Sequence, residues 1–247
     1  MIPHLQPRIW EPKEGYDAVA DWYEGSHWYK FWNRNEVPYF ERVAENLHDS
    51  TKFDGLDLGS GTGRYSVLLA KYCRKVTAID ISPGMIRAAR KRHNIGYRLG
   101  DVRYGIPSGD WSLVTLARVL SHVHQPNDVL KSILRSSSCK DVAIFISDIH
   151  PSHRYLATSF DRRGEKVFIE TLKHKPESII AGTDLQWFYK EFHFSDLMWQ
   201  PEGTRFTSVD RLSINPIFFC LWGVRGEKWE NNITRSALSI GLQNQVG

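Results

Sequence analysis

Hydrophobic residues follow two alternating spacings through the middle of the chain. Short apolar runs of strand length occupy residues 53–58, 75–80, 95–100, 111–117 and 141–147. Between several of them lie sets at helical spacing, namely Tyr65, Leu68, Leu69 and Tyr72, and then Val129, Leu130, Ile133 and Leu134. Strands that alternate with helices form βαβ units with right-handed crossovers. We therefore expect an α/β fold with a doubly wound, mostly parallel sheet.

The first 48 residues have a helical and strongly aromatic pattern. One face of a helix that we expect to begin near Pro38 carries Phe40, Val43, Ala44 and Leu47. The preceding residues 16–32 include Tyr16, Trp22, Tyr23, Trp28, Tyr29, Phe31 and Trp32. Aromatic side chains at this density either form a core or line a pocket for a flat or cationic ligand.

The pattern changes after about residue 149. Residues 167–172 and 184–192 are strand-like and are separated by a polar turn, so we expect them to form a hairpin. A short helix around residues 195–199 and two further strands, 205–214 and 216–224, should follow. Strands joined by short links pair antiparallel, which predicts an antiparallel edge beside the parallel sheet.

Composition and charge exclude several classes of protein. The chain has 247 residues, of which 41% are hydrophobic, with a net charge of +4 and no long basic tail. Its three widely spaced cysteines favour neither a disulfide framework nor a zinc site, and we expect no metal. No apolar run is long enough for a membrane helix, and residues 1–15 lack the apolar core of a secretory signal. We therefore expect a cytoplasmic protein.

A glycine-rich loop follows the first strand of the alternating region. Residues 56–63 read Leu-Asp-Leu-Gly-Ser-Gly-Thr-Gly, and Asp80 ends the next strand, where an acid can accept hydrogen bonds from ribose hydroxyls. Arg64 stands where a dinucleotide loop has its last glycine, and no Gly-Lys-Ser/Thr of a Walker A loop follows. The loop and Asp80 together predict a nucleotide-like ligand of another kind.

Four segments resemble the motifs of class I S-adenosylmethionine-dependent methyltransferases, especially the small-molecule branch. They are residues 56–65, 76–90, 99–101 and 118–123, in the order and spacing of that family. The resemblance covers residues 16–150 well, and it implies seven strands and S-adenosyl-L-methionine as cofactor. It also implies methyl transfer to an O, N or C atom of a small, partly apolar metabolite. We expect a helical lid at 1–48 and a cofactor-binding core at 49–150. Residues 151–247 would supply a hairpin cap at about 165–192 and the antiparallel strands.

The resemblance also implies which residues bind the cofactor. Gly59, Ser60 and Gly61 would lie against its amino-acid and ribose portions, Asp57 would place the loop and the ammonium, and Asp80 would bind the diol. Ile81 and Met85 would sandwich the adenine, and Asp101 would accept from its amine beside Val102. The expected set is completed by Tyr16, Tyr23, Gly63 and Arg118. Ser82 should cap the helix that begins at Pro83.

A protic acceptor needs a base, and histidine suits this role near neutral pH. His150 follows the fifth strand of the alternating region, so we expect it on the floor of the site, with His174 and His193 as further candidates. Trp28, Tyr29 and Trp187 would line the acceptor pocket with His150. His122 and His124 are too close together for a helical metal site, and we interpret them as structural or supporting residues.

Other functions stay open at this point. A non-catalytic S-adenosylmethionine-binding regulatory module, a methyltransferase for protein or RNA, and a decarboxylating or aminopropyl-transferring relative would share the loop and Asp80. Residues 116–120 read Leu-Ala-Arg-Val-Leu where methyltransferases of nucleic-acid bases carry an Asn/Asp-Pro-Pro-Tyr tetrapeptide, and this difference argues against a nucleic-acid partner. The oligomeric state, monomer or homodimer, is also open.

Overall fold

The main sheet joins strands from both halves of the chain. The computed structural model describes residues 8–45, 53–153, 157–162, 165–198, 215–226, 229 and 243–245. Within these residues the strand order is β11-β9-β10-β6-β5-β2-β3-β4. The strands are β2 (Asp54–Leu58), β3 (Lys75–Asp80), β4 (Ile95–Leu99), β5 (Trp111–Ala117), β6 (Val142–Ile149), β9 (Gln186–Phe192), β10 (Phe218–Arg225) and the short β11 (Gln243–Gln245). In this spatial order, the seven strands that begin with β9 and end with β4 form the seven-stranded sheet that the resemblance implies. The short strand β11 pairs with β9 and extends the edge of the sheet.

The arrangement of the central strands places a ligand crevice. The predicted strands β2 to β6 are confirmed, and they pair in parallel. From β2, the next two strands in the chain lie on one side and β5 and β6 lie on the other. Chain order therefore reverses between β2 and β5. In doubly wound sheets, ligands bind outside the carboxyl ends of the strands at this reversal.

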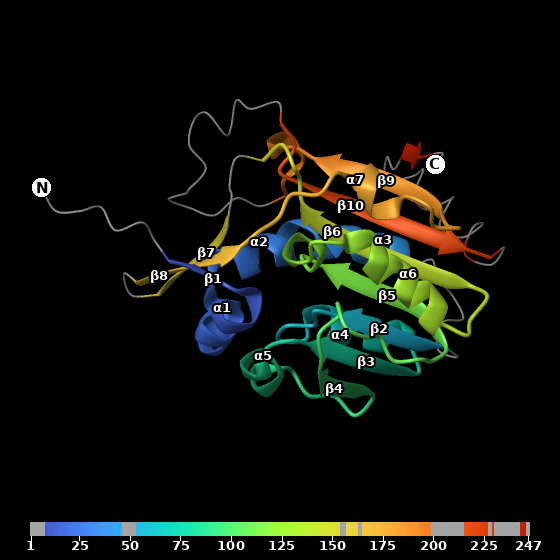
Figure 1. The fold of residues 1–247 in the computed structure, drawn as a ribbon, viewed down its shortest axis with the longest axis horizontal. Helices are drawn as coiled ribbons and strands as arrows, with labels where there is room; N and C mark the ends of the chain where they lie inside the picture. The colour runs from blue at the N-terminus through green and yellow to red at the C-terminus, as the bar shows by residue number, and fades with distance from the viewer. Residues whose placement is uncertain are drawn as a thin grey trace, which may run out of the picture.

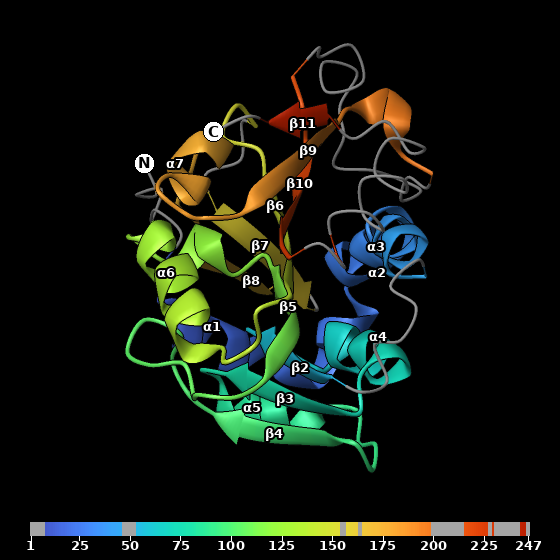
Figure 2. The ribbon, with the colours of Figure 1, turned by 90° about the vertical axis from the view of Figure 1, so that its right-hand side faces the viewer.

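Helices cover both faces of the main sheet, as Figure 2 shows. One face carries α2 (His27–Asn35), α3 (Val37–Ala44) and α4 (Arg64–Tyr72), and the other carries α6 (Pro126–Ser136) and α7 (Pro176–Ile180). Along β6, Phe145 packs into the cluster that contains α3, whereas Ile144 and Ile146 pack into the cluster that contains α6. This alternation follows from the two-residue period of a strand. The helix expected near Pro38 is confirmed as α3.

The antiparallel edge is confirmed, but the predicted hairpin is wrong. Strand β10 pairs antiparallel with both β6 and β9. Residues 167–172 do not pair with 184–192, because β8 (Glu165–Glu170) pairs antiparallel with β7 (Ala157–Arg162) and parallel with β1 (Ile9–Trp10). Trp187 and Phe188 of β9 are buried in the clusters on opposite faces of the main sheet. Burial on both faces suits an inner strand, so β9 pairs with β10.

A small separate sheet and the first helix cover one end of the molecule (Figure 1). This sheet has the order β1-β8-β7, so the cap pairs residues 157–162 with residues 165–170 and does not span 165–192. Its apolar side packs with α1 (Pro12–Val19), η1 (Ala20–Gly25) and Met85 of α5 (Pro83–Ala88). Asp17 joins α1 to α5, because its Oδ1 accepts from Ser82 Oγ at 2.5 Å and from Gly84 N at 2.7 Å.

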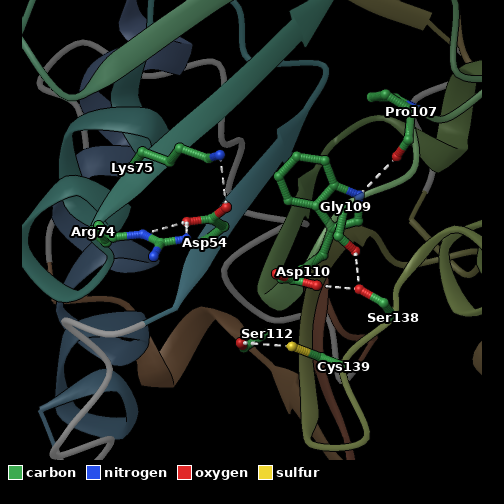
Figure 3. Close-up of polar contacts among 10 residues, drawn as sticks. Asp54, Arg74, Lys75, Pro107, Gly109, Asp110, Ser112, Ser138 and Cys139 are labelled. Carbon is green, nitrogen blue, oxygen red and sulfur yellow. Dashed lines mark hydrogen bonds and ion pairs between the residues drawn. The ribbon is translucent and has the colours of Figure 1, made fainter.

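Ion pairs hold the amino ends of the central strands, opposite the crevice (Figure 3). The buried carboxylate of Asp54 lies 3.0 Å from Arg74 Nη2 and 3.0 Å from Lys75 Nζ. The indole of Trp111 donates to Pro107 O at 2.7 Å. The ion pairs join β2 to the start of β3, and the Trp111 bond holds the loop that leads into β5, all at the side of the sheet away from the crevice.

The remaining expectations have mixed outcomes. The helix expected around 195–199 appears as a short 3₁₀ helix, η4 (Phe194–Asp196). Another short 3₁₀ helix, η3 (Leu120–His122), follows β5. The strand expected at 205–214 lies outside the described residues. The division of the chain near residues 48 and 150 stays a prediction. No helix in the described ranges has the length and apolar character that crossing a membrane requires.

Candidate functional site

A tight loop joins β2 to α4 at the carboxyl end of the central strand. Gly59 has φ +65° and Gly61 has φ +54°, values in the left-handed region that glycine adopts without strain. A Cβ on Gly59 would lie 2.3 Å from a Cγ atom of Val119, so a larger residue would collide. A Cβ on Gly61 would meet nothing within 4 Å, because this residue borders a cavity. The backbone at Gly61 is therefore open to a ligand.

The carboxylate of Asp80 braces this loop from the end of β3. Its Oδ2 accepts from Gly61 N at 2.7 Å, and its Oδ1 accepts from Ser82 N at 2.8 Å. Burial raises the pKa of Asp80 to about 6. Each oxygen keeps a further lone pair for a ligand hydroxyl. The expected cap is also confirmed, since Ser82 Oγ accepts from Met85 N at 3.0 Å.

The main cavity lies above the carboxyl ends of β2, β3 and β5. It is lined by Pro12, Tyr16, Tyr23, Gly59, Gly61, Asp80, Ile81, Met85, Gly100, Asp101, Val102, Arg103, Ala117, Arg118, Val119, His122 and Val123. An adjoining smaller cavity is lined by Asp57 and Ser60. Gly63 caps the start of α4 with φ +87° and lines neither cavity. The structure thus brings together every expected cofactor residue except Gly63.

One end of the main cavity suits an adenine. Ile81, Met85 and Val102 supply apolar surface there. Asp101 is held by Arg103, whose Nη2 lies 2.6 Å from Asp101 Oδ2 and whose amide donates to Oδ1 at 2.9 Å. Burial raises the pKa of Asp101, but the bonds from Arg103 outweigh it and keep that pKa below its ordinary value. The ionised carboxylate retains lone pairs for an exocyclic amine.

The smaller cavity reaches the buried carboxylate of Asp57 under the glycine loop. Its Oδ1 accepts from Thr115 Oγ1 at 2.8 Å, and its Oδ2 accepts from Ser66 Oγ at 2.6 Å. Burial raises the pKa of Asp57 to about 6. Asp57 therefore ties the loop to β5 and α4, and at neutral pH it presents a negative charge to the smaller cavity.

A tyrosine and a histidine in the lining of the main cavity contact each other. The Tyr16 hydroxyl lies 2.9 Å from His122 Nε2, and His122 Nδ1 lies 2.6 Å from the carbonyl oxygen of Glu170. A carbonyl only accepts, so Nδ1 carries the proton and Nε2 accepts from Tyr16. Burial lowers the pKa of His122 to about 4 and raises that of Tyr16 well above its ordinary value. Both groups are therefore neutral at physiological pH.

Arg118 stands between the two cavities at the end of β5. It has φ +58°, and its guanidinium lies 4.6 Å from the ring centre of Trp32. Its Nη1 donates to the fully buried carboxylate of Glu36, which also accepts from Tyr65 and Ser147. This network joins α3 to the ends of β5 and β6. The charge of Arg118 is therefore compensated inside the protein.

The three expected bases do not line the cavities. His150 Nε2 lies 3.2 Å from Glu191 Oε1, and its Nδ1 accepts from Ser152 N at 3.1 Å. His193 Nε2 lies 3.7 Å from the other oxygen of Glu191. His174 follows β8, with a buried Nε2 that has no hydrogen-bond partner among the described residues. The expected position of His150 on the cavity floor is therefore wrong, because Glu191 of β9 holds its ring elsewhere.

The expected acceptor-pocket aromatics also lie outside the cavity lining. Trp28 stacks on Trp32 with ring centres 6.1 Å apart. Tyr29 is buried under the guanidinium of Arg64, at 4.2 Å. Trp187 packs over Gly223, and its indole donates to Thr183 Oγ1 at 2.9 Å. In the described structure these three rings pack in the protein core. Core packing was the first of the two roles that we expected for the aromatic residues, and lining a ligand pocket was the second.

Sequence reasoning interpreted His122 as a structural or supporting residue and did not single out Glu36. His122 follows β5 just as His150 follows β6, so its position after a parallel strand was a usable signal. Glu36 stands at the break between α2 and α3, and no local pattern distinguishes it from a surface acid. Its burial depends on where α3 packs.

Affinity for S-adenosylhomocysteine should fall as the pH drops below about 6. The pKa values of Asp80 and Asp57 are raised to about 6, and a ligand that needs the ionised carboxylates competes with protons below that pH. We expect a loss of up to about tenfold per pH unit for each group. Calorimetric titration from pH 5 to 8 measures it, and Asp80→Asn should flatten the slope. Equal affinity at pH 5 and pH 7.5 in the unmodified protein would contradict this assignment.

Comparisons with known proteins agree with the fold and the loop. Residues 56–138 match a family model described as a methyltransferase domain. A methyltransferase of Dictyostelium discoideum is 38% identical over 85 residues, which are 34% of this chain and 32% of that protein. The mitochondrial ubiquinone biosynthesis O-methyltransferase of Schizosaccharomyces pombe is 30% identical over 122 residues, or 46% of this chain and 44% of the relative. The chain thus spans less than half the length of these curated relatives.

Solved structures support the same fold. DhpI in complex with SAH has a TM-score of 0.55 at 20% identity, covering 88% of this chain and 96% of DhpI. The methyltransferase bound to the Trm112 activator of Haloferax volcanii has a TM-score of 0.63 at 16% identity, covering 89% and 100%. The matched family model shows that residues 56–138 form a methyltransferase domain, and the sheet topology and the solved structures show that this domain has the Rossmann-like fold of the S-adenosylmethionine-dependent methyltransferases.

Proposed function

We propose that the protein transfers a methyl group from S-adenosylmethionine to an O, N or C atom of a small, partly apolar metabolite. The observation that carries this proposal is the continuity of the main cavity. Its lining includes Asp80 and Met85, which are expected to hold the nucleoside, and also Tyr16, Tyr23 and His122. The first helix and the cap sheet pack around Met85, with Tyr16 and Tyr23 beside them. Such a covered cavity suits a discrete molecule better than a polymer chain.

The residues that line the cavity would serve the cofactor and the acceptor together. Asp80 would hold the ribose diol, Asp101 and Val102 the adenine edge, and the Gly61 backbone the chain between them. The bound cofactor supplies an activated methyl on a sulfonium centre. The protein's task is then to align the acceptor atom and exclude water. Tyr16 and Tyr23 line the cavity where they would do both.

The Tyr16 and His122 pair is the best-placed contact for a protic acceptor. His122 Nε2 takes the phenol proton in a hydrogen bond, which leaves lone pairs of the Tyr16 oxygen for an acceptor O–H or N–H. The pair would orient the acceptor and pass its proton from the Tyr16 oxygen toward Nε2. Catalysis by His150 stays a prediction, and the contacts of His150 with Glu191 do not support it. The relative from Schizosaccharomyces pombe, named an O-methyltransferase, favours a hydroxyl acceptor.

Transfer of a radiolabelled methyl group to a cell extract tests the proposal. We expect label in the small-molecule fraction after size separation, and a gain of 14 mass units on the acceptor. Label in protein or RNA would identify a macromolecular methyltransferase instead, and binding of S-adenosylhomocysteine without transfer would identify a regulatory module. The Asp80→Asn variant is the control. Because it should bind the cofactor weakly, any label that it leaves in the extract comes from a source other than methyl transfer by this protein. A cytoplasmic location stays a prediction.

A further inference from the structure

A second cavity lies at the amino ends of the central strands, on the side of the main sheet away from the cofactor crevice. Its volume is about 510 Å³, which falls within the range of roughly 300–1,000 Å³ that small-molecule sites occupy. We call it the amino-end groove. Its ionisable lining residues are Asp54, Arg74, Lys75, His93, Arg98 and Asp110. None of these six lines the main cavity or the smaller cavity beside it.

The groove is open because the chain has no helix between β4 and β5. Residues 100–110, all of which the structure describes, form turns and irregular segments there. Helices normally cover both faces of a parallel sheet, and this connection leaves part of one face uncovered. Thr77 of β3 and its register partner Gly96 of β4 both line the groove. Gly96 has no side chain to fill the space, and a Cβ there would lie 3.9 Å from Val76 O.

Two cations at this groove are held in place by one buried acid. Arg74 donates from Nε and Nη2 to Asp54 Oδ1 at 3.1 and 3.0 Å, and Lys75 Nζ lies 3.0 Å from Oδ2 (Figure 3). The side chain of Asp54 is 4% exposed, whereas those of Arg74 and Lys75 are 58% and 60% exposed. One negative charge thus orients two positive charges, and their remaining N–H groups are accessible to a ligand.

Two further basic groups have no partner in the protein. Arg98 of β4 and His93 in the turn before it are exposed, and neither has a hydrogen bond, ion pair or ring contact among the described residues. Asp110 is the only exposed acid in the described lining, and it already bonds the Ser138 hydroxyl. The lining therefore carries an excess of positive charge, and the guanidinium of Arg98 is free to bind an anion.

Charge and size together define the ligand. Arginine binds phosphate oxygens through a bidentate fork, and lysine supplies a point charge. Arg98 lies three residues along β4 from Ile95, or roughly 10 Å. A ligand that contacts both Arg98 and the cations at the start of β3 must extend over that length. Val76, Ile95 and Trp111 contribute apolar atoms to the same lining. These features match an organic phosphate better than an inorganic ion.

We propose that the amino-end groove is a second binding site, which takes an organic phosphate of about nucleotide size. Arg98 would bind the phosphate, and Arg74 and Lys75 would contact a second polar group of the same ligand. The site is separate from the cofactor crevice, because the two lie at opposite ends of the parallel strands. The proposal is therefore independent of the identity of the methyl acceptor.

Calorimetric titration with ADP tests the site. The full chain is first saturated with S-adenosylhomocysteine, so that adenine cannot enter the cofactor crevice, and we expect one saturable site for ADP. Arg98→Gln should bind ADP at least tenfold more weakly, because it loses a charge-assisted contact to the phosphate. Arg87→Gln, at an exposed position on α5 outside the groove, is the matched control and should bind ADP like the unmodified protein.

Substitutions at Gly96 test whether the ligand lies in the groove itself. Gly96→Glu adds a carboxylate where the structure has space, and Gly96→Gln adds a side chain of the same size without the charge. Gly96→Glu should bind ADP at least tenfold more weakly than Gly96→Gln, because the added carboxylate repels the phosphate. Thermal unfolding of these variants and of Arg98→Gln should stay close to that of the unmodified protein, since both positions are exposed.

Inorganic pyrophosphate distinguishes the two sources of phosphate. It should bind at least tenfold more weakly than ADP, because it has no organic body to contact the apolar part of the lining. Equal affinity would assign the groove to an inorganic anion and would overturn the organic ligand. The proposal is also overturned if ADP does not saturate the protein, or if Arg98→Gln and Arg87→Gln lose equal affinity.

Discussion

Asp80→Asn should weaken the binding of S-adenosylhomocysteine about 100-fold. The carboxylate accepts from Gly61 N and Ser82 N and keeps free lone pairs toward the cavity. Hydrogen bonds to charged groups contribute roughly 1.5–3 kcal/mol each, and about 1.4 kcal/mol is a tenfold change in affinity. An amide has one oxygen, so it cannot hold both backbone donors and a ribose diol. Isothermal titration at pH 7.5 measures the loss.

A matched acid at the other end of the sheet controls this experiment. Asp110 bonds the Ser138 hydroxyl at the amino edge of the strands, away from the cavity (Figure 3). Asp110→Asn should therefore bind S-adenosylhomocysteine like the unmodified protein. If Asp80→Asn also retains full affinity, Asp80 does not bind the ribose, and its role is confined to holding the glycine loop.

Tyr16→Phe and His122→Ala should each lower turnover about 100-fold or more, the usual scale for a proton-transferring group. Both side chains line the main cavity and are hydrogen-bonded to each other at 2.9 Å. The proposal assigns the ribose to Asp80 and the adenine edge to Asp101 and Val102, and it gives Tyr16, which was expected in the cofactor set, to the acceptor. Affinity for S-adenosylhomocysteine should therefore change less than about threefold in either variant. Labelled methyl transfer to the identified acceptor gives turnover, and calorimetry gives affinity. The double variant should be no slower than the slower single variant, because the two groups act as one unit.

His150→Ala is the comparison variant for this pair. Its ring is engaged by Glu191 and the Ser152 amide, so we expect turnover within about threefold of the unmodified protein. The pH dependence separates the two histidines further. With a pKa of about 4, His122 is neutral above pH 5, and turnover should show no inflection near 6.5 from this group. A 100-fold loss in His150→Ala together with full activity in Tyr16→Phe would restore His150 as the base.

The strand and loop predictions succeeded because they depend on local spacing. An apolar run of strand length records burial within one segment, and β2, β3, β5 and β6 were all found where such runs occur. The run at 95–100 also forms a strand, β4, although this edge strand has no buried residue. Gly59, Gly61 and Asp80 were also predictable, because a tight turn and a strand-terminal acid leave a local signature. These features fixed the residues of the cavity that are expected to hold the cofactor.

Pairing across long distances in the chain was decided by tertiary packing alone. The apolar runs 167–172 and 184–192 looked alike, yet β9 is buried on both faces and joined the main sheet, whereas β8 joined β7 and β1. The same holds for the proposed acceptor contact, where Tyr16 and His122 meet across 106 residues. Arg118 and Glu36 likewise meet across 82 residues.

The sequence by itself therefore determined the α/β core, the glycine loop and the acid that together identify the cofactor. Only the tertiary structure decided which histidine faces the cavity, which arginine has a counter-charge and which strands form the cap. The physical reason is that hydrophobic spacing encodes the burial of one segment against solvent. The partner of a buried polar group depends instead on how helices and strands from distant parts of the chain pack together.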